Sequence, residues 1–195
     1  MEDFPTSGKY EYSLLHRRVF VYGPLMAEEA RNELLAPGSR IISNRPGKVH
    51  GYGRWSFKDV PLPAALPAGS LVRCDGLLLE RLQPAELRAI DSFMDTRFER
   101  LVVHVTAENG FGGSEDLEAL MYVCPTAEAK LLDTNKPWAY PEFREQHMRA
   151  FIERMVKPHR LKFVEEEQLL TERTKAKEQA VLEEMAKEEA ATAPP

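Results

Sequence analysis

The chain has 195 residues, of which 43% are apolar, and its formal net charge at pH 7 is −5. This length suits one compact domain with an extension, and the apolar content is sufficient for a hydrophobic core. The negative charge disfavours a nucleic-acid surface, which depends on clustered Lys and Arg. No segment approaches the roughly 20 continuous apolar residues of a membrane span, so we expect no membrane contact.

The N-terminal residues and the cysteines predict a cytoplasmic protein without a bound metal. Residues 1–9 have neither the apolar core of a secretion signal nor the Arg-rich face of an organelle signal. Cys74 and Cys124 lie far apart within apolar runs, so we expect buried free thiols in a reducing compartment. None of the five histidines lies at zinc-ligand spacing from them. We expect no metal and no cofactor, and a place in an organelle assembly stays open beside the cytoplasm.

Residues 19–22 predict the first strand, after an N-terminal extension at residues 1–17. The strand consists of Val and aromatic residues and runs directly into a turn at Gly23, after which a helix is predicted through Leu35. A strand that ends in a turn at a helix start leaves backbone N–H groups that can hold an anion. Gly23 also lets a ligand approach closely. An ordinary strand-to-helix connection explains the same pattern equally well.

The remaining elements up to residue 158 predict an α+β fold. A Pro-rich segment at residues 59–69 is expected to be a rigid extended loop. A short helix opens at Pro84, with Leu87, Ile90 and Phe93 on its apolar face. Mixed strands with few helices indicate a small, mixed, partly closed β-barrel. Further strands are predicted at residues 40–43, 48–57, 76–82, 98–107 and 117–124, the last two joined by a hairpin turn at residues 109–113.

A charged helical tail is predicted at residues 159–195. It is rich in Glu, Lys and Ala, and its large apolar side chains fall into two clusters, at Leu169 and Leu170 and at residues 181–185. The ten residues between the clusters break any heptad, which disfavours a long coiled coil. A solvated single helix is the simplest explanation, and contact of the 160–190 helix with a protein partner or with the barrel is the alternative. We expect the last residues to be disordered.

Four segments resemble one protein family. Residues 19–26 read VFVYGPLM and resemble the YGSL or YGTL signature of the γ-glutamylcyclotransferase-like superfamily, in particular its AIG2-like branch. Residues 49–52, then 63–66 with 74–80, and finally 87–100 follow in the family's order. The last segment reads LRAIDSFMDTRFER beside the family's L-x-x-L-D-x-F-E-G-x-E-Y-x-R. Residues 138–152 resemble the closing helix of the plant members. The resemblance implies a γ-glutamylcyclotransferase-like (AIG2-like) domain at residues 18–158.

The resemblance implies that the turn after the first strand binds the substrate. In the family, this loop holds the substrate's α-carboxylate largely through backbone amides. Pro24 stands at the family's Ser or Thr position, so one N–H and one hydroxyl are missing. Phe98, at a family Tyr position, is implied as an aromatic wall together with Tyr22, and plain core packing is the alternative for both. The implied substrate-binding residues are therefore Tyr22, Gly23, Pro24, Leu25 and Phe98.

The resemblance also implies a catalytic carboxylate, and here the chain departs from the family. The general acid/base of the family is the Glu of L-D-x-F-E, and Met94 stands at that position. Asp95 follows directly, but a one-residue offset turns a side chain in a different direction, so Asp95 is a weak substitute as catalytic residue. Loss of a positioned acid/base typically lowers the rate by roughly 10²–10⁴-fold.

Two functions are open. The first is a transferase of the acyltransferase type that cyclises the γ-glutamyl group of a small molecule to 5-oxoproline, with activity impaired because Met94 replaces the family Glu and Asp95 would have to transfer the proton. The second is a catalytically inactive AIG2-like domain, a pseudoenzyme that serves as a scaffold or subunit in a larger assembly. Such a domain would contact its partner through the C-terminal helix.

Overall fold

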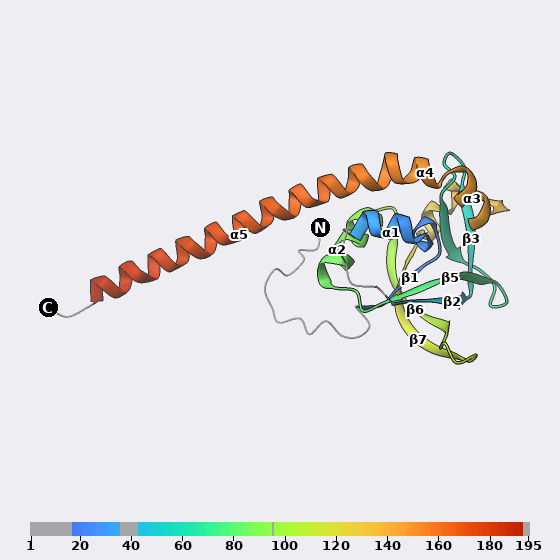
Figure 1. Cartoon of the computed structure of the whole chain (residues 1–195), viewed down its shortest axis with the longest axis horizontal. Helices are drawn as coiled ribbons and strands as arrows, with labels where there is room; N and C mark the ends of the chain where they lie inside the picture. Colours follow the sequence, from blue (N-terminus) through green and yellow to red (C-terminus); the bar gives the residue numbers. More distant parts are fainter. Residues whose placement is uncertain (1–16, 36–42, 95, 193–195) are drawn as a thin grey trace.

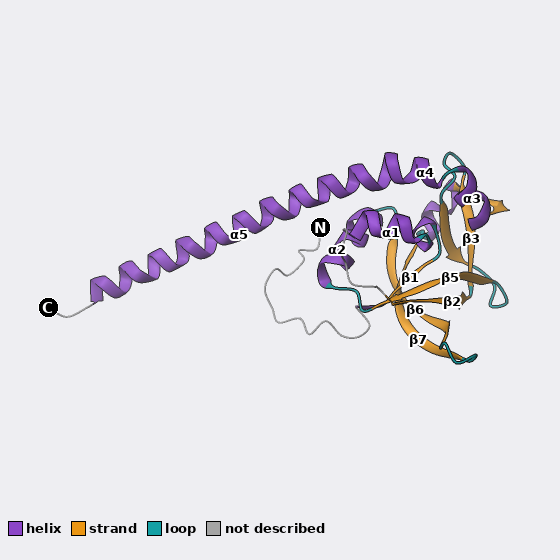
Figure 2. Ribbon diagram, in the orientation of Figure 1, coloured by secondary structure: helices purple, strands orange, loops and turns teal. Residues whose placement is uncertain are grey.

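A closed five-stranded barrel forms the body of the molecule (Figures 1 and 2). The computed structural model describes residues 17–35, 43–94 and 96–192. The barrel strands, in their order around the barrel, are β1 (Val19–Val21), β5 (Arg73–Glu80), β2 (Ser43–His50), β6 (Glu99–Glu108) and β7 (Ser114–Val123). A second sheet contains, in order, β4 (Pro63–Pro67), β3 (Tyr52–Phe57) and β8 (Leu132–Pro137). The predicted α+β barrel is confirmed.

Short helices lie against the barrel, and one long helix leaves it (Figure 1). The short helices are α1 (Glu28–Leu35), α2 (Pro84–Met94), α3 (Tyr140–Gln146) and α4 (Met148–Phe151), with 3-10 turns at η2 (Pro24–Met26) and η3 (Thr126–Leu131). A π-helical turn, η4 (Ile152–Val156), connects α4 to the long helix α5 (Lys157–Thr192). Within the described part of the chain, no helix combines the length and apolarity that crossing a membrane requires.

The strand β1 closes the barrel. It pairs antiparallel with β5 on one edge and parallel with β7 on the other, and all three of its residues are buried. Burial on both faces explains why its sequence is a continuous apolar run rather than an alternation. Gly76 of β5 permits the close pairing, because a Cβ atom there would lie 2.3 Å from the carbonyl oxygen of Val21.

The start of α2 follows from a local sequence signal. Pro84 stands in the first turn, where the missing N–H would have no partner within the helix. The Glu86 carboxylate accepts a hydrogen bond of 2.6 Å from the N–H of Gln83, as in a capping box. Leu87 and Ile90 are buried in the main hydrophobic cluster. The predicted helix and its apolar face are thus confirmed.

Two expectations for the middle of the chain are wrong. Residues 48–57 do not form one strand, because the chain breaks between β2 and β3 at Gly51, whose φ is +80°. The Pro-rich segment at residues 59–69 is not all loop, since its centre pairs with β3 as the strand β4. β4 is the edge strand of its sheet, with Pro63 and Pro67 at its two ends, where the missing N–H groups are tolerated.

Several predictions lie outside the described residues. These are most of the N-terminal extension (residues 1–16), part of the strand expected at residues 40–43, and the last residues of the tail (193–195). The division of the chain at residues 17/18 and 158/159 stays a prediction. α5, which was expected to be a helix, already begins at Lys157.

Within the part of the chain that the structure describes, α5 packs on the domain through its first turns, and the rest of the helix extends away from the barrel (Figure 1). Phe163 is buried, and Glu167 accepts a hydrogen bond of 2.7 Å from Arg88 of α2. Farther along, the apolar side chains are exposed, with Leu169 at 54% and Leu182 at 64%. Contact of this segment with a protein partner stays a prediction.

We expect Gly76→Ala to destabilise the fold, because the added methyl group collides with the backbone of β1. Strain of this kind costs about 1–3 kcal/mol, which urea unfolding followed by circular dichroism would measure. Gly69→Ala is the matched control, since a Cβ atom at Gly69 meets nothing within 4 Å. Equal unfolding midpoints for the two variants would contradict the tight pairing of β1 with β5.

Candidate functional site

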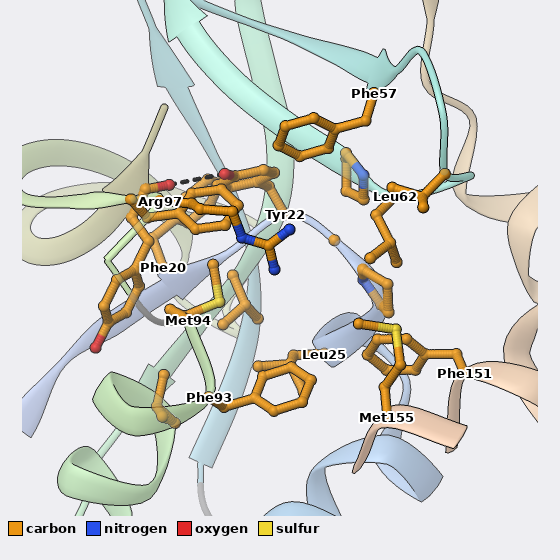
Figure 3. Close-up of a pocket in the computed structure, with 18 residues that line it drawn as sticks. Phe20, Tyr22, Leu25, Phe57, Leu62, Phe93, Met94, Arg97, Phe151 and Met155 are labelled. Carbon is orange, nitrogen blue, oxygen red and sulfur yellow. Dashed lines mark hydrogen bonds between the residues drawn. The ribbon is translucent and has the colours of Figure 1, made fainter. Parts of the chain in front are cut away.

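A cavity lies at the end of β1. It is enclosed by the turn after β1, the end of α2, the loop after β3 and the helical segment that carries Phe151 and Met155 (Figure 3). Its volume is about 90 Å³, several times the roughly 10–15 Å³ that a single water needs. The cavity therefore has room for part of a small molecule.

The cavity brings together residues that the sequence singled out from three separate segments. Asp95, the expected catalytic residue, lies outside the described residues, so its position relative to the cavity stays open. The roles of the other residues as ligand contacts stay predictions. The singled-out residues that line the cavity are Tyr22, Gly23, Pro24 and Leu25 from the turn, Met94 from α2, and Phe98 before β6.

The described wall of the cavity is predominantly apolar. Aromatic, aliphatic and thioether side chains form most of it, and Phe93 and Phe151 meet edge to face with their ring centroids 5.9 Å apart. Among the described lining residues, none carries a carboxylate, and Arg97 alone is charged. Figure 3 shows the guanidinium group of Arg97 in the middle of the view, among the labelled side chains that line the cavity.

The turn after β1 is shaped by a glycine and a proline. Gly23 precedes η2 and accepts a hydrogen bond of 2.9 Å from the N–H of Met26. A Cβ atom on Gly23 would lie 2.9 Å from the side chain of Pro63, so glycine lets β4 pack against the turn. Pro24 occupies the first position of η2, where its missing N–H would have no partner within the helix.

Two arginines hold the carbonyl groups of this turn. Arg54 donates a hydrogen bond of 2.6 Å to the carbonyl of Tyr22, and Arg31 donates to the carbonyls of Leu25 and Met26 at 2.8 and 2.7 Å. Burial lowers the pKa of both guanidinium groups, yet arginine stays protonated in proteins. Because N–H and C=O of a trans peptide point in opposite directions, the amide that follows Tyr22 is turned away from Arg54.

Arg54 and Arg31 together form a clamp on the turn, and Trp138 packs against Arg54. The guanidinium group of Arg54 lies over the indole ring, 4.9 Å from its centroid, and the N–H of Trp138 donates to the carbonyl of Arg54 at 3.1 Å. The indole N–H donates to the carbonyl of Pro61 at 3.0 Å. Trp138 thus connects the segment before α3 to the turn.

Tyr22 is a core residue whose ring also lines the cavity. Its hydroxyl donates to the carbonyl of Tyr122 at 2.7 Å and accepts from the N–H of Ala65 at 3.1 Å. Burial raises the pKa of Tyr22 far above its usual value, so the group stays neutral at physiological pH. The hydroxyl proton of Tyr22 is held in the hydrogen bond to the Tyr122 carbonyl and is not positioned to be exchanged with a ligand.

A polar cluster that the sequence reasoning missed lies beside the cavity. Tyr122 lines the cavity, and its hydroxyl donates to the carboxylate of Asp91. Arg100 donates to both oxygens of that carboxylate, at 2.8 and 2.6 Å. Burial, with the nearby Asp91 charge, raises the pKa of Tyr122. The cluster connects α2 to β6 and β7. In the sequence, the Asp and Arg of the motif at residues 87–100 could have indicated it.

A second missed signal concerns charge. The family pattern quoted for residues 87–100 has Glu at the positions of both Met94 and Arg97, so this chain replaces one acid with a thioether and the other with a cation. Both side chains line the cavity. Asp95, which stands where the pattern has Gly, adds an acid to the same segment but lies outside the described residues.

Metal and thiol chemistry find no support among the described residues. They contain no group of three or more His, Cys, Asp and Glu side chains that could hold a metal ion. Cys74 and Cys124 are buried free thiols, as predicted. Burial raises the pKa of the Cys74 thiol to about 12, so it is not a nucleophile near neutral pH.

A family model described as γ-glutamyl cyclotransferase, AIG2-like, matches residues 19–140. The chain belongs to this family. AIG2-like protein C of Arabidopsis thaliana is 28% identical over 146 residues, which make up 75% of this chain and 77% of that protein. Protein AIG2 C of the same plant is 26% identical over 135 residues, or 69% of this chain and 76% of that protein.

A solved structure has a similar fold. The solution structure of an Arabidopsis thaliana protein superposes with a TM-score of 0.53 at 25% identity, over 70% of this chain and 78% of that chain. The residues matched by the family model include the turn after β1, Met94 and Phe98. Phe151 and Met155, which also line the cavity, lie outside the matched residues.

We expect Arg31→Met to destabilise the protein, because it leaves the carbonyls of Leu25 and Met26 without their donor. Each buried acceptor left unpaired costs about 1–3 kcal/mol, measurable as a lower urea midpoint. Arg144→Met is the control, since Arg144 is 60% exposed and reaches Glu29 only at 3.7 Å. A midpoint unchanged from wild type in Arg31→Met would show that the clamp does not hold the turn.

Proposed function

We propose that this protein is an AIG2-like domain that binds a small molecule in its cavity and has lost most γ-glutamyl cyclisation activity. The observation that carries the proposal is Met94, which lines the cavity from the position of the family acid/base. Cyclisation needs a group that accepts and returns a proton in the transition state. A thioether cannot do so near neutral pH.

The neighbouring groups support this proposal. The hydroxyls of Tyr22 and Tyr122 are engaged and have raised pKa values. The carboxylate of Asp91 is held by Arg100 and Tyr122. The described lining residues thus contain no group suited to exchange a proton with a substrate. Asp95, outside the described residues, is the remaining candidate for an enzyme with a displaced acid/base.

We also propose a location and a partner for this domain. A domain of this kind is a pseudoenzyme rather than a transferase or acyltransferase, and we propose that it acts in the cytoplasm. A protein partner of the 160–190 helix is a second proposal, favoured by exposed apolar side chains of α5 such as Leu170 and Met185, 57% and 61% exposed. An apolar groove that receives one face of a helix is the surface that such side chains would fit.

We expect Met94→Glu to restore the missing chemistry. Its release of 5-oxoproline from γ-glutamylalanine should exceed that of wild type by roughly 10²–10⁴-fold, the usual value of a positioned acid/base. Because Pro24 withholds one amide from the substrate, the double variant with Pro24→Ser is the more complete restoration. The assay measures 5-oxoproline by liquid chromatography.

Met155→Glu is the matched control. It brings the same carboxylate to another wall of the same cavity and should leave 5-oxoproline release at the wild-type level. The proposal fails if wild type already turns over γ-glutamylalanine at the rate of Met94→Glu and loses that activity in Asp95→Asn. That result would identify an enzyme whose proton is transferred by Asp95.

A further inference from the structure

The cavity has a buried interior and an exposed rim. Phe151 is 6% exposed and belongs to the interior wall. Met155 lines the same cavity but is 37% exposed. Val60 and Arg97, which also line it, are exposed as well. These three side chains border both the cavity and the solvent, so they form the described part of its rim.

The interior is held in place by contacts between aromatic rings. Phe151 meets Phe93 and Phe143 edge to face, with ring centroids 5.9 and 5.8 Å apart. Phe93 also meets the ring of His159, at 5.2 Å between centroids. Met94 packs against the main hydrophobic cluster. Side chains packed on several sides cannot move without opening a void, so the interior keeps its shape.

Met155 has more freedom to move than its neighbours at the rim. Its unbranched thioether side chain has several rotatable bonds, and because it is partly exposed it can turn into the solvent without emptying a packed core. Val60 is branched at Cβ, which restricts its χ1 angle. Arg97 has an interaction of its own within the chain. Met155 is therefore the rim side chain best able to open and close the cavity.

A π-helical turn places Met155 at the rim. In η4 the N–H of Lys157 donates to the carbonyl of Ile152, five residues earlier. Phe151 and Val156, which are also five residues apart, are both buried. Met155 is left beside this buried face, where it borders the cavity and the solvent.

The cavity as it stands is smaller than the ligand group that its walls suit. Its volume is about 90 Å³, whereas an apolar cavity that holds benzene measures roughly 150 Å³. The ring surfaces of Phe93 and Phe98 and the thioether of Met94 favour contact with an aromatic group. Outward rotation of Met155 would add space at the rim for such a ring.

We propose that Met155 is a gate, and that the cavity takes a molecule carrying one aromatic ring when this side chain turns outward. The inference rests on the binding role proposed above and adds a ligand class and the residue that limits ligand size. It requires no charge on the ligand, because the contacts that it invokes are apolar.

Fluorobenzene, an uncharged single ring, tests the gate by fluorine NMR titration of the full chain. We expect Met155→Ala to bind it roughly 3- to 10-fold more tightly than wild type, because no side chain has to leave a favoured rotamer. Met155→Ile is similar in size but stiff at χ1. It should bind fluorobenzene more weakly than wild type, by roughly the same factor.

A second probe and a control variant locate the effect. 1-Fluoronaphthalene, with two fused rings, should bind Met155→Ala more tightly than wild type by a larger factor than fluorobenzene does, because it needs more of the space at the rim. Leu161→Ala is the control, since Leu161 is an exposed residue of α5 that does not line the cavity. It should keep the wild-type affinity for both probes. Circular dichroism checks that each variant folds as wild type does.

The gate is overturned if fluorobenzene binds none of these proteins, if wild type and the two folded Met155 variants bind it equally, or if Leu161→Ala changes its affinity as Met155→Ala does. None of these results bears on the proposed loss of catalysis, which 5-oxoproline release from Met94→Glu judges with Met155 unchanged. Turnover of γ-glutamylalanine by wild type would overturn that loss and leave the gate standing.

Discussion

The turn after β1 depends on two buried guanidinium groups, and the cavity depends on the turn. Arg54 binds the carbonyl of Tyr22, and Arg31 binds those of Leu25 and Met26. β1 itself is fixed on both edges by β5 and β7. A turn held in this way needs no ligand to keep its shape. The cavity is thus pre-formed, whatever chemistry its lining residues can support.

The contacts that hold the fold and the residue that carries the proposed loss of activity are different. The fold is held in part by the pairing of β1, by Arg54 and Arg31 on the turn, and by the Asp91–Arg100–Tyr122 cluster. The proposed loss of activity rests instead on Met94, which belongs to none of these three groups of contacts. The Met94 side chain is partly buried and packs against the main hydrophobic cluster.

The sequence predicted elements that carry their own local signals. β1 was predicted because it is an apolar run, and α2 because Pro84 and Glu86 mark a helix start within a few residues. β4 was missed because prolines indicate a loop unless the strand lies at a sheet edge, which only pairing with β3 establishes. In the site, the motif located the turn and Met94. It could not locate Phe151 and Met155, because contacts across more than fifty residues leave no local pattern.

The helical segment that leads into α5 also forms part of the cavity wall, through Phe151 and Met155. Met155 lies in the π-helical turn η4, and α5 begins two residues later at Lys157. A π-helical turn inserts one residue into a helix and changes which side chains face inward, a feature frequent at functional sites. Here the segment supplies two apolar walls from outside the residues matched by the family model. Met94 and this helical segment therefore contribute apolar side chains to the same cavity from two parts of the chain.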